Sequence, residues 1–174
     1  GNVKLCFQPA EEGAGGAIKR VDAGVLENPK VDYAIGMHID PSLKVGQAAI
    51  EVGPITAYPE FFTIKLIGSG GHGSLPFKSI DPILPAVRLY DMFNLITKEI
   101  CPLNPNVVQI CAFNAGSMPA AIPDTCELKG TVRTHHLEDK RKIKSRIFEF
   151  TENISKLYNV KYEINYWGED KPVV

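Results

Sequence analysis

The stretch FFTIKLIGSGGHGSLPFKSIDPILPAVRLYDMFNLI, residues 61–96, decides how this chain folds. Residues 61–67 are an apolar run of strand length, and residues 68–76 form a glycine-rich loop. Asp81 and Pro82 then supply an N-cap and a first-turn proline for a helix. The helix has an apolar stripe made by Ala86, Leu89, Tyr90, Phe93 and Ile96. The stretch therefore predicts a strand, a loop and a helix in that order.

Towards the C-terminus the pattern continues with further strands and a second helix. Residues 107–113 and 125–133 are strand candidates separated by a loop, which suits an antiparallel pair. Residues 160–167 alternate like a closing strand. The helix before it has an apolar stripe made by Ile143, Ile147, Phe150, Ile154 and Leu157. The predicted order is βαββαβ, the arrangement of an α+β domain of ferredoxin-like type.

The N-terminal part predicts a different architecture. Residues 3–7 form a short apolar run, and residues 15–26 carry apolar residues at helical spacing. Residues 31–39 are nearly continuous in apolar character, which is typical of a strand covered on both faces. Residues 45–52 add another strand. We therefore expect an α/β segment that begins as βαβ with parallel pairing.

The composition limits the size of the fold and the kinds of partner that we expect. The chain has 174 residues, of which 44% are hydrophobic and 22% charged, as in a soluble domain or two small ones. The formal net charge of -1 gives no indication of nucleic acid or of an anionic membrane as a partner, so we expect a small molecule. No uncharged apolar stretch approaches the ~20 residues that a bilayer requires.

The N-terminus and the cysteines indicate the cellular compartment in which we expect the protein. The chain begins directly in a strand pattern, without the architecture of a signal peptide, so we expect a cytoplasmic protein and an internal fragment of a longer one. The cysteines lack CxxC spacing, and we interpret them as reduced core thiols. They are Cys6, Cys101, Cys111 and Cys126.

Two motifs in the N-terminal segment carry chemistry. FQPAEEG, residues 7–13, places Glu11 and Glu12 side by side in a loop after an apolar run, and His38 follows the apolar run 31–37. Neighbouring carboxylates can divide the holding of a metal from the movement of protons, because each environment sets its own pKa. The end of a strand is where open α/β sheets bind ligands. A solvated glutamate pair and a merely hydrogen-bonded histidine are the alternatives.

The glycine-rich loop raises the question of a dinucleotide site. Residues 68–73, GSGGHG, satisfy GxGxxG after a strand. We reject this interpretation, because Pro76 falls where the phosphate-binding helix would already be running. The glycines then serve a tight turn, and His72 is either a bystander or a functional residue.

Taken together, four motifs resemble one enzyme family. In order they are FQPAEEG, GMH, GSGGHGSLPxxxxDPI and IPDTCELKGTVRT. They are similar to motifs of the metal-dependent amidohydrolases of the aminoacylase, hippurate hydrolase, N-acyl-L-amino-acid amidohydrolase and auxin-conjugate hydrolase type. The resemblance implies a zinc-peptidase-like α/β catalytic domain interrupted by a ferredoxin-like lid that also forms a homodimer. Residues 1–54 would be part of the catalytic domain, residues 55–167 the lid, and residues 168–174 the return to the catalytic domain.

The resemblance also implies roles for individual residues. Glu11 would be the general base, and Glu12 and His38 would bind a divalent metal, zinc or manganese, with two ions in a complete site. His72 would reach across the dimer to the developing oxyanion. Arg133 would pair with a substrate carboxylate, the alternative being an ordinary exposed strand arginine. Two ligands are fewer than the three usual for catalytic zinc, so we expect these 174 residues alone to bind metal poorly and to be inactive.

The function implied is hydrolysis of the amide bond of an N-acyl amino acid or a peptide-like substrate. A carboxypeptidase or dipeptidase of the same family is one alternative, and a non-catalytic dimerising interaction module is another. The chain departs from the family pattern at Phe77, where relatives have a histidine, and at Ala120-Ala121, where they often have an asparagine.

Overall fold

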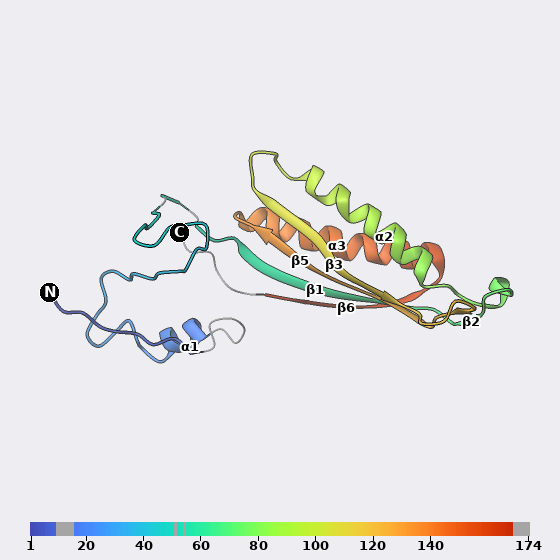
Figure 1. Cartoon of the computed structure of the whole chain (residues 1–174), viewed down its shortest axis with the longest axis horizontal. Coiled ribbons are helices and arrows are strands. Elements are labelled where there is room, and N and C mark those ends of the chain that lie inside the picture. The colour runs from blue at the N-terminus through green and yellow to red at the C-terminus, as the bar shows by residue number, and fades with distance from the viewer. Residues whose placement is uncertain (10–15, 51, 54, 169–174) are drawn as a thin grey trace. The chain divides into compact units, whose positions relative to one another are not determined.

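The computed structural model describes residues 1–9, 16–50, 52–53 and 55–168 (Figure 1). The chain divides into two compact units, Gly1–Ile50 (unit 1) and Glu51–Val174 (unit 2). Each unit is described by itself. That unit 1 belongs to a catalytic domain and unit 2 to a lid stays a prediction.

Unit 2 is built on a four-stranded sheet. In this sheet β1 (Tyr58–Ile67) lies between β5 (Thr125–Thr134) and β6 (Lys161–Trp167). The edge strand β3 (Asn106–Ala115) pairs with the other side of β5. All three pairings are antiparallel. Together with the helix after β1 and the helix after β5, this confirms the predicted βαββαβ order.

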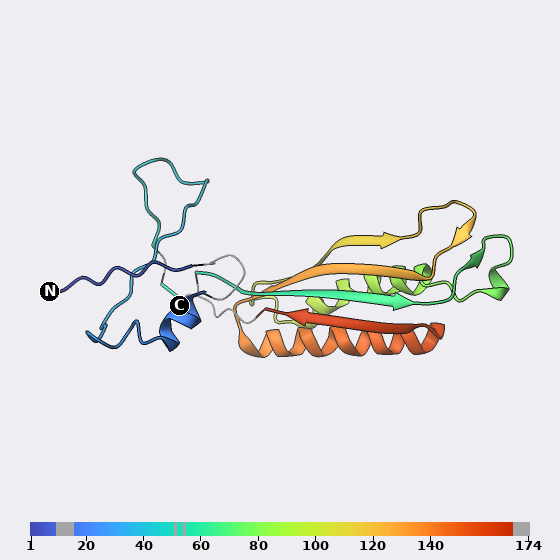
Figure 2. The same cartoon turned by 90° about the horizontal axis from the view of Figure 1, so that it is seen from below.

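Alternation along the strands creates the core of unit 2. Successive side chains of a strand point to opposite faces, and Phe62, Ile64 and Leu66 of β1 are fully buried together with Leu128 of β5. Phe61, which directly precedes Phe62 on β1, is exposed. Both helices lie against the same face of the sheet (Figures 1 and 2). The core therefore sits between one layer of helices and one layer of strands.

The two helices bury the stripes that their spacing predicts, with two exceptions. In α2 (Ile83–Ile96) and α3 (Leu137–Tyr158) the buried stripe residues are Ala86, Leu89, Phe93, Ile96, Ile143, Ile147, Phe150 and Ile154. Tyr90 and Leu157 are instead 40% and 74% exposed, because they lie at the margins of their stripes. The N-cap position of α2 is Pro82 instead of the predicted Asp81, and Asp81, one residue earlier, accepts a hydrogen bond from the backbone N–H of Ile83 at 2.8 Å.

Short elements complete unit 2. They are β2 (Gly71–His72), the 3₁₀ turns η1 (Pro76–Lys78) and η2 (Thr97–Glu99), and β4 (Ala121–Ile122). β2 and β4 form an antiparallel pair of their own. These elements bring the loop after β1 beside the loop that connects β3 to β5.

Unit 1 corrects the prediction of a βαβ segment. Its helix α1 (Gly16–Asp22) lies within the predicted range 15–26. The expected strands at 3–7, 31–39 and 45–52 are wrong for this structure, because no described residue of these ranges is paired in a sheet. A strand is stable only when its N–H and C=O groups find partners, and none of the described residues of unit 1 supplies them.

Two further expectations concern the burial of the cysteines and the presence of a membrane-spanning helix. Cys126 is buried as predicted, whereas Cys6, Cys101 and Cys111 are exposed, so they are not core thiols; all four are free. Burial raises the pKa of the Cys126 thiol to about 11, so it stays protonated. Within the described ranges, no helix combines the length and the apolar composition that a membrane span requires.

Candidate functional site

His72 lies on β2 at one end of unit 2 (Figure 1), with its side chain exposed. The backbone N–H of Ser74 donates to its Nδ1 at 3.2 Å, and the Ser74 hydroxyl lies 2.8 Å from the same atom. Because a backbone N–H can only donate, Nδ1 acts as an acceptor there. In the neutral ring the proton then sits on Nε2, and that N–H has no partner among the described residues. The loop therefore presents a hydrogen-bond donor outwards.

The loop that presents His72 is held by the segment before β5. The backbone N–H of Gly68 donates to the Asp124 carbonyl at 2.8 Å, and that of Gly70 donates to Asp124 Oδ1 at 2.8 Å. A Cβ on Gly68 would lie 2.0 Å from the oxygen of Ile80, and one on Gly70 would lie 2.6 Å from the oxygen of Ile122. The glycines are thus required by close backbone packing, not by phosphate binding. This supports rejecting a dinucleotide site.

The two departures from the family pattern lie around this loop. Phe77, in η1, is 78% exposed. Ala120 contributes a backbone hydrogen bond, because its carbonyl accepts the N–H of Gly73 at 2.8 Å. Neither position adds a polar side chain beside His72, so within the described residues only Ser74 contacts the imidazole through hydrogen bonds.

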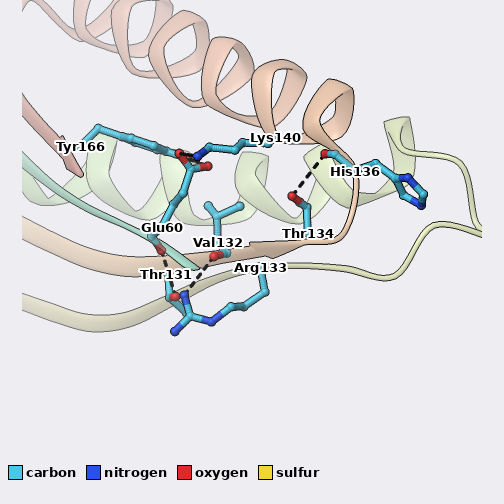
Figure 3. Close-up of polar contacts among 8 residues, drawn as sticks. All are labelled: Glu60, Thr131, Val132, Arg133, Thr134, His136, Lys140 and Tyr166. Carbon is cyan, nitrogen blue, oxygen red and sulfur yellow. Dashed lines mark hydrogen bonds and ion pairs between the residues drawn. The ribbon is translucent and has the colours of Figure 1, made fainter. Parts of the chain in front are cut away.

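Arg133 lies on the sheet face opposite the helices, near the C-terminal end of β5 (Figure 3). Its guanidinium carbon is 4.9 Å from the centre of the Phe61 ring, and Phe61 stacks on Trp167 at 5.9 Å. Nη1 donates to the Val132 carbonyl at 3.2 Å. The residue lines a groove of about 340 Å³ together with Phe61, Trp167 and Thr131. An arginine stacked on a ring keeps the edge of its planar fork free to bind a carboxylate.

His72 and Arg133 lie at opposite ends of unit 2. Arg133 pairs with Pro59, near the start of β1, whereas the loop that carries His72 begins after Ile67, at the end of β1. From Pro59 to Ile67, strand residues at about 3.3 Å each span about 26 Å. Within one chain, the two side chains cannot contact the same amino-acid-sized molecule.

Glu11 and Glu12, the expected base and metal ligand, lie outside the described residues. His38 is described, and it is exposed in a segment without sheet pairing. Nearby, hydrogen bonds from the hydroxyl and the backbone of Ser42 lower the pKa of Asp40, and the charge of His38 lowers it slightly further. The described residues contain no group of three or more His, Cys, Asp and Glu side chains that could hold a metal ion. They offer His38 as a chemically suitable donor but do not enclose a metal.

A buried polar cluster was missed from the sequence (Figure 3). Glu60 is only 2% exposed; its Oε2 accepts the Tyr166 hydroxyl at 2.8 Å, and its Oε1 lies 3.3 Å from Lys140 Nζ. Burial and then the Glu60 carboxylate raise the pKa of Tyr166 far above its ordinary value. The signal was available, because alternation places Glu60 on the same face as Phe62.

Comparison with known proteins gives a consistent result. The sequence model of peptidase family M20/M25/M40 matches the whole chain, residues 1–174. It is 33% identical over 174 residues to N-acetyl-L-cysteine deacetylase of Bacillus subtilis, covering 99% of this chain and 41% of that protein. It is 35% identical over 176 residues to thermostable carboxypeptidase 2 of Saccharolobus solfataricus, covering 99% of this chain and 44% of that protein.

A solved structure extends this likeness. The chain matches a dinuclear metal-binding peptidase of the M20 family from Bacillus subtilis with a TM-score of 0.69 and 32% identity, over 96% of this chain and 41% of that one. The chain thus spans less than half the length of these relatives.

Proposed function

Because the chain belongs to peptidase family M20/M25/M40, we propose that it is part of a metal-dependent hydrolase that splits the amide bond of N-acyl amino acids. The products would be a carboxylic acid and an amino acid. The observation that carries the proposal is the His72 loop, which presents an Nε2–H donor with no other partner among the described residues. A relative named for deacetylation of an N-acetyl amino acid supports this choice of substrate.

In this proposal the N-terminal motifs supply the metal site and the base. Glu12 and His38 would be ligands of a divalent metal, zinc or manganese, with two ions in the complete site. When bound, such ions activate water and polarise the substrate carbonyl. Glu11 would take a proton from the attacking water and later deliver it to the leaving nitrogen. A solved relative described as dinuclear and metal-binding supports the stoichiometry.

His72 and Arg133 would act on the substrate directly. The Nε2–H of His72 would donate to the oxygen that gains negative charge as the carbonyl is attacked, where a fixed donor is most effective. Arg133 would pair with the substrate carboxylate through the free edge of its guanidinium. Its stacking on Phe61 at 4.9 Å restricts the side chain before the substrate arrives.

The separation of these two residues supports a homodimer. Because about 26 Å separates the two ends of β1, His72 and Arg133 can serve one substrate only if they come from different subunits. The free edge of β3 has no paired strand among the described residues. Beside it, α2 exposes Leu84, Val87 and Leu95 by 46%, 42% and 47%. We propose that a second copy covers this surface, so that His72 completes the partner's site.

Subunit exchange tests the proposal. Inactive dimers of the complete protein carrying His72→Ala are mixed with inactive Glu11→Gln dimers under conditions that exchange subunits. Activity should return, because one site of each mixed dimer combines an intact base with an intact partner histidine. His136→Ala, at an exposed histidine before α3, is the control and should remain active alone. If exchange is verified by mass and no activity returns, His72 does not act across the dimer.

A carboxypeptidase is the second candidate, because the chain is 35% identical to a protein named as one. The two activities differ in whether the group on the nitrogen is a simple acyl group or a peptide. Comparing kcat/KM for N-acetyl and N-benzoyl amino acids with that for dipeptides and tripeptides of the same C-terminal residue decides between them.

A further inference from the structure

Unit 2 contains a cavity that the proposed reaction does not use. It has a volume of about 450 Å³ and lies between the N-terminal half of α3 and the ends of β1 and β6. We call it the anion pocket and define it by Glu60, Lys140, Arg141, Lys144 and Tyr166, which all line it. Its volume is within the range of about 300–1,000 Å³ that is usual for small-molecule sites.

The residues that the structure describes do not balance the charges of this pocket. The Glu60 carboxylate is occupied by the Tyr166 hydroxyl at 2.8 Å and by Lys140 at 3.3 Å (Figure 3), so Lys140 and Glu60 neutralise each other. Arg141 and Lys144 make no ion pair with a carboxylate among the described residues. Among the described residues, two positive charges at the pocket therefore have no ion-pair partner.

The other cations of α3 provide the contrast. Arg146 pairs with Glu99 at 2.8 Å and with Glu149 at 2.6 Å, and Lys156 pairs with Glu152. Lys142 donates to the Glu99 carbonyl. Arg141 and Lys144 are thus the two cations of α3 to which the described residues supply neither an ion pair nor a hydrogen-bond acceptor.

The placement of these cations is electrostatically unfavourable without an anion. The first turn of α3 carries Glu138 and Asp139, and Arg141 and Lys144 lie beyond it. Arg141 and Lys144 are three positions apart on the helix, so their like charges repel each other. Lys144 Nζ is held 4.9 Å from the centre of the Tyr166 ring, which fixes it at the wall of the pocket.

We propose that the anion pocket binds a small molecule through a phosphate group, with Arg141 and Lys144 pairing with its oxygens. A phosphate monoester carries about -1.5 to -2 charges at neutral pH, which matches two uncompensated cations better than a single carboxylate does. The remaining volume would hold the ester's organic part. Tyr166 and Glu60, already bonded to each other, would form the floor.

A binding experiment tests this site independently of hydrolysis. The purified chain is titrated with inorganic phosphate and with glycerol phosphate at constant ionic strength set by sodium chloride, and binding is followed by calorimetry and amide chemical shifts. Both ligands should bind saturably, with shifts centred on the anion pocket. Arg141→Gln and Lys144→Gln should each weaken binding about tenfold, the usual scale for losing one charge-assisted hydrogen bond.

Lys156→Gln is the matched control, because Lys156 lies on the same helix but is paired with Glu152. It should bind phosphate as the unmodified chain does, and Lys144→Arg should retain most of the affinity. Thermal unfolding without phosphate establishes that each variant is folded. The proposal is overturned if binding is not saturable, if Lys156→Gln weakens it as much as Lys144→Gln, or if the shifts centre elsewhere.

Discussion

Unit 1 and unit 2 contain similar apolar runs but bury them very differently. Ile35 and Met37, in an expected strand of unit 1, are 94% and 99% exposed. Ile64 and Leu66, in β1 of unit 2, are fully buried. All four residues are apolar, so the difference lies in their neighbours. The strands of unit 2 pair with one another inside one contiguous segment, whereas the expected strands of unit 1 find no sheet partner among the described residues.

An apolar run therefore predicts where a strand can form but not which neighbouring strands and helices complete the sheet. A parallel sheet is stable only when both of its faces and its neighbouring strands are present. A two-stranded βαβ segment is marginal by itself. The antiparallel sheet of unit 2 needs cover on only one face, and α2 and α3 provide it. Stability should therefore reside in unit 2, and the following variants test that division.

Two phenylalanines, one in each unit, should differ most in their contribution to stability. Phe62, in unit 2, is fully buried and packs edge-to-face on Phe93 at 5.6 Å, whereas Phe7, in unit 1, is 80% exposed. Phe62→Ala should lower the free energy of unfolding by about 3–5 kcal/mol. Phe7→Ala should change it by less than about 0.5 kcal/mol. Urea denaturation followed by circular dichroism measures both. A similar loss for Phe7→Ala would show that unit 1 has a core of its own.

The sequence predicted unit 2 well because its signals are local and mutually consistent. The expected strand 61–67 lies within β1, and the pairing of 107–113 with 125–133 is confirmed in β3 and β5. In unit 2, the spacing of apolar residues along strands and along helices was sufficient to predict the order of the elements. The β2–β4 pair could not be predicted, because two residues carry no periodicity.

The candidate site was predicted in a different way. No periodicity assigns a role to Glu11, Glu12 or His38, and only the order of the motifs suggested one. What the structure adds is physical: the acceptor state of His72 Nδ1 and the separation of His72 from Arg133. Neither is readable from sequence, because the first depends on the conformation of the loop around Ser74 and the second on how β1 and β5 are paired.

The second prediction places the chemistry in unit 1. In the complete protein, Glu11→Gln should retain its metal but reduce kcat at least ~10²-fold, about 2.7 kcal/mol, the scale of a lost general base. Glu12→Ala should instead lower metal occupancy. Neither should change the unfolding of unit 2. Metal analysis beside steady-state kinetics measures these effects. If Glu11→Gln loses metal while Glu12→Ala keeps both metal and rate, the two roles are wrongly assigned.

The third prediction compares a tyrosine from each unit. Tyr166 donates to buried Glu60, whereas Tyr33 is 90% exposed. Tyr166→Phe should cost about 1–2 kcal/mol, because it leaves a buried carboxylate oxygen without its donor. Tyr33→Phe should cost nothing measurable.

The same pair gives a pH dependence. The pKa of Tyr166 is raised in the folded state by burial and then by Glu60, so above about pH 10 the unfolded chain loses this proton first. Tyr166 thus contributes stability at lower pH, and that contribution is lost as pH rises above about 10. Unfolding measured between pH 8 and pH 11 should decline less steeply for Tyr166→Phe. An unchanged alkaline decline would contradict the assignment.

The smallest expected effect concerns two residues in the left-handed backbone region, one in each unit. Asn159 ends α3 with φ of 54°, and Gly24 follows α1 with φ of 79°. Asparagine tolerates this conformation, but alanine does so at a cost, so Asn159→Ala should lower the free energy of unfolding by about 1 kcal/mol. Asn159→Gly should stay within about 0.5 kcal/mol, which separates backbone strain from loss of the side chain. Gly24→Ala introduces the same strain in unit 1, but it should leave the main unfolding transition unchanged, because that transition reports the core of unit 2. Equal shifts of the urea midpoint for Gly24→Ala and Asn159→Ala would mean that the two units unfold as one, and the division of stability between them would be wrong.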